Sequence, residues 1–402
     1  MHRLAFIALA LVLAGCLQVH DGSPAHTAAS SSSSTAPLPP LPVAPEPAPV
    51  VEVVPLAAPT SIGHVFVIVL ENEDFASTFP ASDPPSPELA INLTAQGRFL
   101  PQYYGIGHAS LDNYIAMVSG QAPNPVTQAD CAYYAEFLGS AGGPDGQAIG
   151  HGCVYPAAVL TIGDQLTAAN HTWRAYAEDM ANSPETAPTS CRHQAMNTQD
   201  TWQGSSATDQ YATRHEPFVY FHSLIDDQTA CEAHVVDLKL LEADLASVNS
   251  TPEFSFITPD VCSDGHDAVC ADPKQRGEYD GIEDFLNAWI PKLTNSSAYQ
   301  KDGLIVVTFD EAEAASPDAC CGEKPGYNTP KPGISGDGGG QVGTVLLSRC
   351  FEPGSKDETP YNHYSFLRTM EDIFHVGHLG YAGQDGLVPF DLGTCNPADP
   401  AQ

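Results

Sequence analysis

Residues 64–70 read His-Val-Phe-Val-Ile-Val-Leu, a continuous apolar run that is rich in β-branched side chains. Such a run is typical of a strand that is buried on both faces of a parallel sheet. Residues 303–309 form a second run of this kind, and shorter strand candidates cover residues 253–258 and 342–348. Helical patterns lie between and after these strands, over residues 162–169, 231–248, 281–293 and 364–375. The alternation predicts an α/β fold with a mostly parallel sheet.

Polar side chains follow the two longest strand candidates. Glu71 and Asn72 come directly after the first strand, and Asp310 and Glu311 come directly after the second. Ligands of α/β sheets bind at the carboxyl ends of the strands, where these residues would meet. Their carboxylates would repel one another without a cation, and their oxygen atoms suit a hard divalent metal ion. The alternative is that Asn72 caps a helix beside solvated acids.

A third polar group opens the stretch from Gly107 to Gly120. Its first half contains His108, Ser110, Asp112 and Asn113, and an apolar run that begins at Tyr114 suits a helix packed on the sheet. A serine at a helix N-terminus can face an anionic substrate, because unpaired backbone N–H groups gather there. The alternative is an ordinary helix cap.

Two further segments combine acids with histidines. Residues 258–267 hold Asp260, Asp264, His266 and Asp267, which suit a metal or phosphate site or, alternatively, a turn braced by a disulfide between Cys262 and Cys270. His363 precedes a helical pattern and is either a ligand, a phosphate donor or a helix-start residue. We interpret the other histidines as loop or structural residues; they include His151, His171, His193, His215 and His222.

The N-terminal part of the chain carries targeting signals. Residues 1–16 have a basic start, an apolar run and a Leu-Ala-Gly-Cys ending that resembles a bacterial lipobox, which makes Cys16 a lipid anchor. The alternative is plain secretion. Residues 17–60 are rich in Ser, Ala and Pro and are predicted to be a disordered tether. Residues 61–402 are then the catalytic domain, with a loop-rich insertion over about 123–216, and they lie outside the cytoplasm.

The composition of the chain limits the ligands and partners that it can be expected to bind. Ten cysteines remain besides Cys16, and no Cys-x-x-Cys pair occurs, so we expect disulfides rather than a thiolate zinc site. The chain has 49 acidic and 15 basic residues and a formal net charge of −34, which argues against nucleic acid as a partner. It also argues against direct docking on an anionic membrane, so membrane contact is expected through the lipid anchor only. An anionic substrate would require a cation in the site.

Taken together, these motifs resemble the bacterial and fungal phosphoesterase family, which holds acid phosphatases and non-haemolytic phospholipases C. The resemblance rests on Glu71-Asn72, the His108 to Tyr114 motif, the Asp264 to Asp267 turn, the segment from Thr308 to Glu311, and His363-Tyr-Ser with its following helix. It implies a three-layer α/β/α sandwich of alkaline phosphatase-like type. Related nucleotide pyrophosphatases have a proline where this chain has Asp112.

The resemblance also implies residue roles. It makes Ser110 the catalytic nucleophile and gives metal ligation to Glu71, Asn72, Asp310, Glu311 and the Ser110 oxygen. His108, Asn113 and His266 would bind the phosphoryl oxygens. A second metal or phosphate site would draw on Asp260, Asp264, Asp267 and His363. The oxygen-rich ligand set favours calcium, magnesium or manganese, whereas a site that includes His266 and His363 would favour zinc or iron.

The expected function is that of an extracytoplasmic, metal-dependent phosphomonoesterase of acid phosphatase type. It would act on a small phosphorylated substrate through a phosphoserine intermediate, and phosphoinositides are one substrate class within the family. One alternative is a phosphodiesterase of phospholipase C type. An alternative of another class is a non-catalytic surface binding protein that keeps the fold.

Overall fold

An eight-stranded sheet forms the centre of the computed structural model, which describes residues 62–182, 188–313, 316–328 and 338–393. The predicted signal peptide, the Cys16 anchor and the tether lie outside the described residues. The strands follow the order β13-β2-β12-β11-β1-β10-β7-β9. Their bounds are β1 (His64–Leu70), β2 (Arg98–Leu100), β7 (Trp173–Ala177), β9 (Val235–Asp237), β10 (Phe254–Thr258), β11 (Gly303–Phe309), β12 (Thr344–Leu347) and β13 (Ser355–Lys356).

The sheet is mostly parallel, as predicted. Strands β9, β7, β10, β1 and β11 run parallel, and β12 runs antiparallel to both of its neighbours, β11 and β2. Every residue of β1 and β11 is buried, which accounts for their unbroken apolar sequences. The predicted bounds of these two strands are confirmed.

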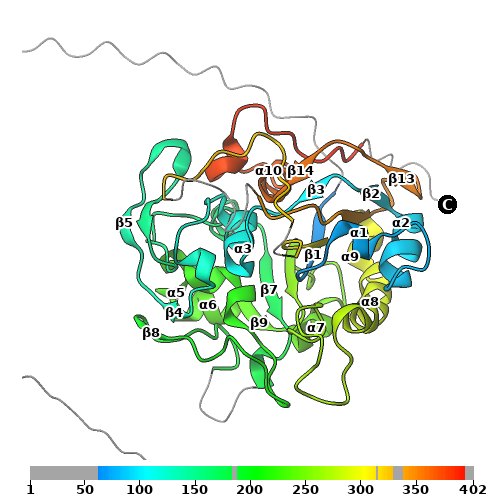
Figure 1. Ribbon diagram of the computed structural model, residues 1–402, viewed down its shortest axis with the longest axis horizontal. Helices are drawn as coiled ribbons and strands as arrows, with labels where there is room; N and C mark the ends of the chain where they lie inside the picture. The colour runs from blue at the N-terminus through cyan, green and yellow to red at the C-terminus, as the bar shows by residue number, and fades with distance from the viewer. Residues whose placement is uncertain (1–61, 183–187, 314–315, 329–337, 394–402) are drawn as a thin grey trace, which may run out of the picture. The chain divides into compact units, whose positions relative to one another are not determined.

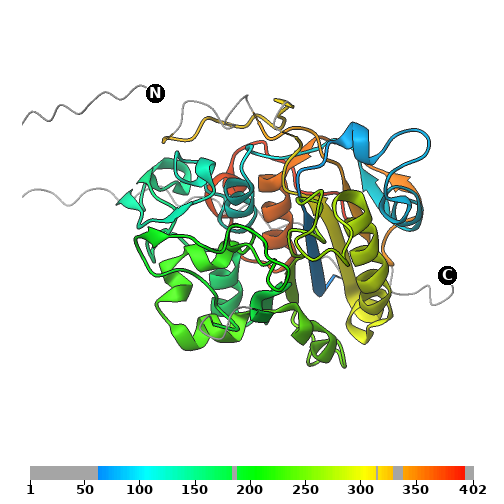
Figure 2. The ribbon, with the colours of Figure 1, turned by 60° about the horizontal axis from the view of Figure 1, so that its bottom comes forward.

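Helices cover both faces of the sheet (Figures 1 and 2). The chain crosses the sheet in one direction from β2 to β7 and in the opposite direction from β10 to β11. Since such crossovers are right-handed, the helices of the two connections lie on opposite faces. One face carries α3 (Ser110–Ser119) and α4 (Ile162–Ala168), and the other carries α8 (Glu278–Asn295) and α9 (Ser297–Asp302); α10 (His363–Ile373) packs against α3. The three-layer α/β/α arrangement is confirmed.

The helix predicted over residues 231–248 is wrong. Helix α6 (Gln228–His234) ends before the β-branched pair Val235-Val236, which opens β9 instead. Strand β9 pairs with β7 and is buried throughout, so its apolar residues serve a sheet rather than a helix face. Asp237 then caps a short turn by accepting a hydrogen bond from the N–H of Lys239 (2.9 Å), and α7 covers only Leu241–Asp244.

The region predicted as a loop-rich insertion, about 123–216, contains helix α4 and the sheet strand β7 as well as shorter elements. The remaining α-helices and strands of the described chain are short: α1 (Phe75–Thr78), α2 (Thr94–Gln96), α5 (His222–Ile225), and the strand pairs β3 (Tyr103–Tyr104) with β14 (Tyr361–Asn362), β4 (Tyr133–Tyr134) with β8 (Thr198–Gln199), and β5 (Leu138–Ser140) with β6 (Ile149–His151). Among the described helices, none is both long and apolar enough to span a bilayer.

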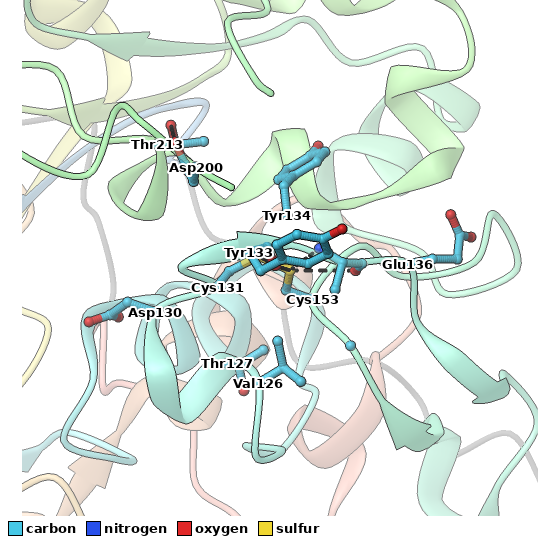
Figure 3. Close-up of a disulfide and its surroundings, with 12 residues drawn as sticks. Val126, Thr127, Asp130, Cys131, Tyr133, Tyr134, Glu136, Cys153, Asp200 and Thr213 are labelled. Carbon is cyan, nitrogen blue, oxygen red and sulfur yellow. Dashed lines mark hydrogen bonds between the residues drawn. A yellow bond between two sulfur atoms is a disulfide. The ribbon is translucent and has the colours of Figure 1, made fainter. Parts of the chain in front are cut away.

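Disulfides cross-link several parts of the described chain. The described residues include the bridges Cys131–Cys153, Cys191–Cys231, Cys262–Cys270 and Cys320–Cys321. Figure 3 shows the first of them beside Tyr133 and Tyr134. The expectation of disulfides is confirmed, and so is the pairing of Cys262 with Cys270.

Candidate active site

The ends of β1 and β11 bring Glu71 and Asp310 together. The strands pair in register up to Leu70 and Phe309, and the N–H of Asp310 donates to the carbonyl of Leu70 (2.9 Å). Both carboxyl groups are fully buried, and Glu71 Oε1 and Asp310 Oδ2 accept no hydrogen bond from the described residues. Burial, and then the neighbouring Glu71 charge, raises the pKa of Asp310 well above its usual range. Buried carboxylate oxygens without donors fit a bound cation.

Asn72 supports this pair through its backbone. Its φ of 57° is left-handed, a conformation that asparagine adopts more readily than most residues. The N–H of Asn72 donates to Asp310 Oδ1 (3.2 Å), which also accepts from the N–H of Glu311 (2.7 Å). One oxygen of Asp310 is thus held by the backbone, and the other is left for a ligand.

Ser110 is the first residue of α3, as the sequence predicts. Its hydroxyl donates a hydrogen bond to Glu71 Oε2 (2.8 Å), and the side chain is buried. The preceding loop is held by Asn113, whose Oδ1 accepts from the N–H groups of Ile106 (2.7 Å) and Gly107 (3.0 Å). The amide of Asn113 donates to Glu311 Oε2 (2.9 Å). Asn113 therefore ties the serine loop to the acids that follow β11.

His108 and Asp112 flank the serine. His108 Nε2 donates to the carbonyl of Ser316 (2.6 Å), and its buried Nδ1 has no hydrogen bond within the described chain. Both carboxyl oxygens of the fully buried Asp112 likewise lack a donor, and burial raises the pKa of Asp112 well above its usual range. A Cβ at Gly107 would come within 2.4 Å of this carboxyl, so any larger residue there would require the Asp112 side chain to move.

His215 lies in the site although it belongs to none of the sequence motifs. Its Nε2 lies 3.4 Å from Glu71 Oε1, and its Nδ1 lies 3.1 Å from Asp264 Oδ2. The ligand atoms of these three buried residues all lie within 4.8 Å of one another, close enough to hold a metal ion. The Tyr114 ring stacks on the imidazole, with ring centroids 5.5 Å apart. The sequence alone favours a loop or structural role for His215, whereas the structure places its imidazole between Glu71 and Asp264.

The turn after β10 places Asp264 beside Glu71 and His215. Its carbonyl accepts from the N–H of Glu71 (2.9 Å), which locks the turn onto the end of β1. Asp260 instead serves the turn itself, because its Oδ1 accepts from the N–H groups of Cys262 (3.0 Å) and Ser263 (2.9 Å). Asp267 Oδ1 accepts from His266 Nδ1 (2.8 Å). Of the residues predicted for a second site, Asp264 alone belongs to the group around Glu71.

His363 lies behind the site. It is fully buried, its Nδ1 accepts a hydrogen bond from the Tyr103 hydroxyl (2.9 Å), and its Nε2 donates to the carbonyl of Asp310. Burial lowers the pKa of His363 to about 4. A neutral imidazole in this place positions the backbone that carries Asp310.

Sequence comparisons agree with the motifs. A family model described as the Phosphoesterase family matches residues 84–377. The chain is similar to a probable acid phosphatase of Kluyveromyces lactis (28% identical, covering 84% of this chain and 64% of the relative) and to an acid phosphatase of Aspergillus fumigatus (24%, covering 84% and 62%). It thus spans less than two thirds of the length of these fungal relatives. A phosphatidylinositol-3-phosphatase of Mycobacterium tuberculosis is 24% identical over 81% of both chains.

Among solved structures, the fold is similar to a protein in the alkaline phosphatase superfamily from Vibrio parahaemolyticus. The identity is 14%, the TM-score is 0.45, and the match covers 82% of this chain and 71% of that one.

Proposed function

The chain belongs to the phosphoesterase family, and we propose that it is an extracytoplasmic, metal-dependent phosphomonoesterase that uses Ser110 as its nucleophile. The observation that carries this proposal is the hydrogen bond from the Ser110 hydroxyl to Glu71 Oε2 (2.8 Å). A hydroxyl at the start of a helix, held by a carboxylate whose other oxygen faces His215, has the surroundings that nucleophilic catalysis requires. The names of the acid phosphatase relatives support the same reaction class.

Four residues have side-chain atoms that would coordinate the metal ion. They are Glu71, His215, Asp264 and the free oxygen of Asp310. An ion bound there would supply the positive charge that lowers the pKa of the serine hydroxyl and offsets charge on the phosphoryl oxygens. Because an imidazole belongs to this set, manganese, zinc or iron suits it better than calcium or magnesium. Asn72 and Glu311 remain predicted ligands.

The residues of the chain then have definite tasks. Glu71 orients the Ser110 hydroxyl for in-line attack on phosphorus, and its carboxylate accepts the hydrogen bond of that hydroxyl in the resting state. The attack forms a phosphoserine and expels the alcohol of the substrate, and water then hydrolyses the phosphoserine. Asn113 and His108 hold the loop that leads to the serine. Their further role as phosphate donors remains a prediction.

Location and substrate class are parts of the proposal. Disulfides such as Cys131–Cys153 form and persist in oxidising compartments, which supports a position outside the cytoplasm. The phosphatidylinositol-3-phosphatase relative makes phosphoinositides a substrate class to test beside small phosphomonoesters.

Replacing the nucleophile tests the proposal. We expect S110A to lower kcat/KM for p-nitrophenyl phosphate at least about a thousandfold, which corresponds to about 4 kcal/mol of transition-state stabilisation. The matched control is S119A at the other end of the same helix, where the hydroxyl donates to the carbonyl of Ile115. If S110A keeps wild-type activity while remaining folded, Ser110 is not the nucleophile. Hydrolysis of p-nitrophenylphosphorylcholine in preference to the monoester would instead favour a phosphodiesterase.

A further inference from the structure

We infer that Arg214 binds the phosphoryl group of the substrate and makes the site select doubly charged monoesters over singly charged diesters. This inference rests on the proposed function, because it assigns a residue of the same site. The evidence for it is the set of contacts made by the buried Arg214 side chain, which is not part of any sequence motif.

Arg214 directly precedes His215 in the short 3₁₀ turn Thr213–His215, and only 5% of its surface is exposed. Burial raises the pKa of Glu71, and the charge of Arg214 opposes that shift, so the guanidinium lies within electrostatic reach of the residue that holds Ser110. The Arg214 charge also acts on Asp264 and His215. His266, which Arg214 contacts, has its ring centroid 6.0 Å from that of His215, so Arg214 lies beside Glu71, His215 and Asp264.

The charge of Arg214 is not balanced by a bonded carboxylate. Within the described residues, the hydrogen bonds of its guanidinium end on the side-chain oxygen of Gln203 (3.2 Å), the carbonyl of Gln203 (2.5 Å) and His266 Nε2 (2.9 Å). By contrast, the buried Arg192 pairs with both oxygens of Asp209. Buried arginines are seldom left without an anionic partner. Arg214 thus fits an anion that the substrate provides.

The guanidinium keeps donors for that anion. Arginine carries more N–H groups than the three contacts use, and its planar fork matches a phosphoryl group. Glu71 and Asp264, which the Arg214 charge reaches, would repel a phosphate, so this permanent cation offsets part of that repulsion. A phosphomonoester dianion gains about twice the attraction that a diester monoanion gains from the same charge.

His266 positions Arg214. A guanidinium can only donate, so His266 Nε2 must accept, and its proton then lies on Nδ1, which donates to Asp267 Oδ1 (2.8 Å). Asp267 Oδ2 accepts in turn from the Ser205 hydroxyl (2.8 Å). In this arrangement His266 acts on the phosphoryl group through Arg214, whereas the family resemblance implies direct contact.

Residues of the predicted insertion also position Arg214. Asp200 accepts from Gln203 Nε2 (2.8 Å) and from the Thr213 hydroxyl (3.3 Å), and thereby braces both the acceptor of Arg214 and its preceding residue. Figure 3 shows Asp200 and Thr213 together near the Cys131–Cys153 disulfide. The N–H of Asp200 donates to the carbonyl of Ala132 (3.0 Å), next to that bridge. The predicted insertion over about 123–216 therefore contributes residues to the site.

The experiment compares R214Q with the wild type on p-nitrophenyl phosphate and bis(p-nitrophenyl) phosphate. We expect kcat/KM for the monoester to fall about a hundredfold and that for the diester to fall less than about fivefold, so the ratio drops at least about tenfold. The control is R276Q, which removes a surface arginine paired with Asp280 and Asp284 and leaves the ratio unchanged. R214K keeps the charge without the fork and is expected to keep part of the preference, which covers the case that R214Q does not fold.

A second readout separates binding from folding. We expect calorimetry to show weaker binding of inorganic phosphate to R214Q and R214K, and to H266L, with partial recovery in H266Q because glutamine offers an oxygen acceptor. Equal losses on both esters with unchanged phosphate affinity would overturn the inference and leave Arg214 as a counter-ion of Glu71 and Asp264. That result would leave the proposed function intact, because S110A tests the nucleophile separately.

Discussion

Glu71 Oε2 accepts the hydrogen bond of the Ser110 hydroxyl at 2.8 Å, while Oε1 of the same carboxyl faces His215 Nε2 at 3.4 Å. One carboxyl therefore connects the candidate nucleophile to the candidate metal group. Glu71 occupies this place because β1 ends there, fully buried and in register with β11. The rigidity of the sheet thus sets the geometry of the site.

Removing the Glu71 charge is expected to disable both functions of the carboxyl. E71Q should lose its bound metal, as measured by elemental analysis, and its kcat/KM for p-nitrophenyl phosphate should fall at least about a hundredfold. E73Q is the matched control, since Glu73 lies two residues further on and is not a member of the metal group. Full metal content in E71Q would contradict the assignment.

His215 is expected to be a metal ligand despite its position outside every sequence motif. H215A should bind the activating metal at least about tenfold more weakly in a titration of the metal-free protein. H378A, which removes a surface imidazole paired with Asp372, serves as the comparison and should bind as the wild type does. If H215A bound the metal as tightly as the wild type, His215 would not be a ligand beside Glu71 and Asp264.

The Cys262–Cys270 bridge should matter for metal binding beyond its contribution to stability. It closes a separation of 8 residues around the turn that carries Asp264 and His266, so its removal costs about 2.5 kcal/mol in the chain-entropy account. We expect C262A/C270A to need several times more metal for half-maximal activity. C191A/C231A should lose about 4 kcal/mol of stability, since its bridge closes a separation of 40, yet keep the metal requirement. The reverse pattern would contradict this account.

Glu371 provides a test of pH dependence away from the site. Burial raises the pKa of Glu371 to about 9, and its Oε1 accepts from the N–H of Leu379 (2.8 Å). The folded state therefore keeps a proton that the unfolded state releases near pH 4.5, so the stabilising effect of that proton is full below pH 4.5 and is lost as the pH rises toward 9.

E371Q removes this titration. Its stability relative to the wild type should increase between pH 5 and pH 8 by on the order of 3 kcal/mol, as measured by urea unfolding at both values. E242Q, which removes an exposed carboxyl paired with Lys292, should show no such change. If the free energies of unfolding of the wild type and of E371Q changed equally with pH, the raised pKa of Glu371 would be refuted.

The strand-end acids could be predicted because their signal is local. An unbroken β-branched run marks a strand buried on both faces, and whatever follows it must lie at the edge where ligands bind. Glu71 and Asp310 were found in this way, and so was the start of α3 at Ser110. The family motif added the Asp264 turn. Glu71, Asp310 and Ser110 sit on or directly after regular elements, and Asp264 lies in the turn that follows β10.

His215 and Arg214 could not be predicted because nothing local marks them. They come from a region of short elements, where placement depends on bridges such as Cys131–Cys153 and on long-range contacts such as that of Asp200 with Thr213. The failed helix over 231–248 has a related cause, since its apolar residues fit a helix face and a buried edge strand equally well. Tertiary pairing with β7 decided between them.

The central claim is that Ser110 carries the phosphoryl group during turnover. It is tested most directly by quenching the enzyme in acid during steady-state hydrolysis of p-nitrophenyl phosphate and mapping phosphorylation by peptide mass spectrometry. The account predicts a single phosphoryl group, on the peptide that contains Ser110, that is absent from S110A. A phosphoryl group on a different residue, or full turnover by S110A, would contradict it.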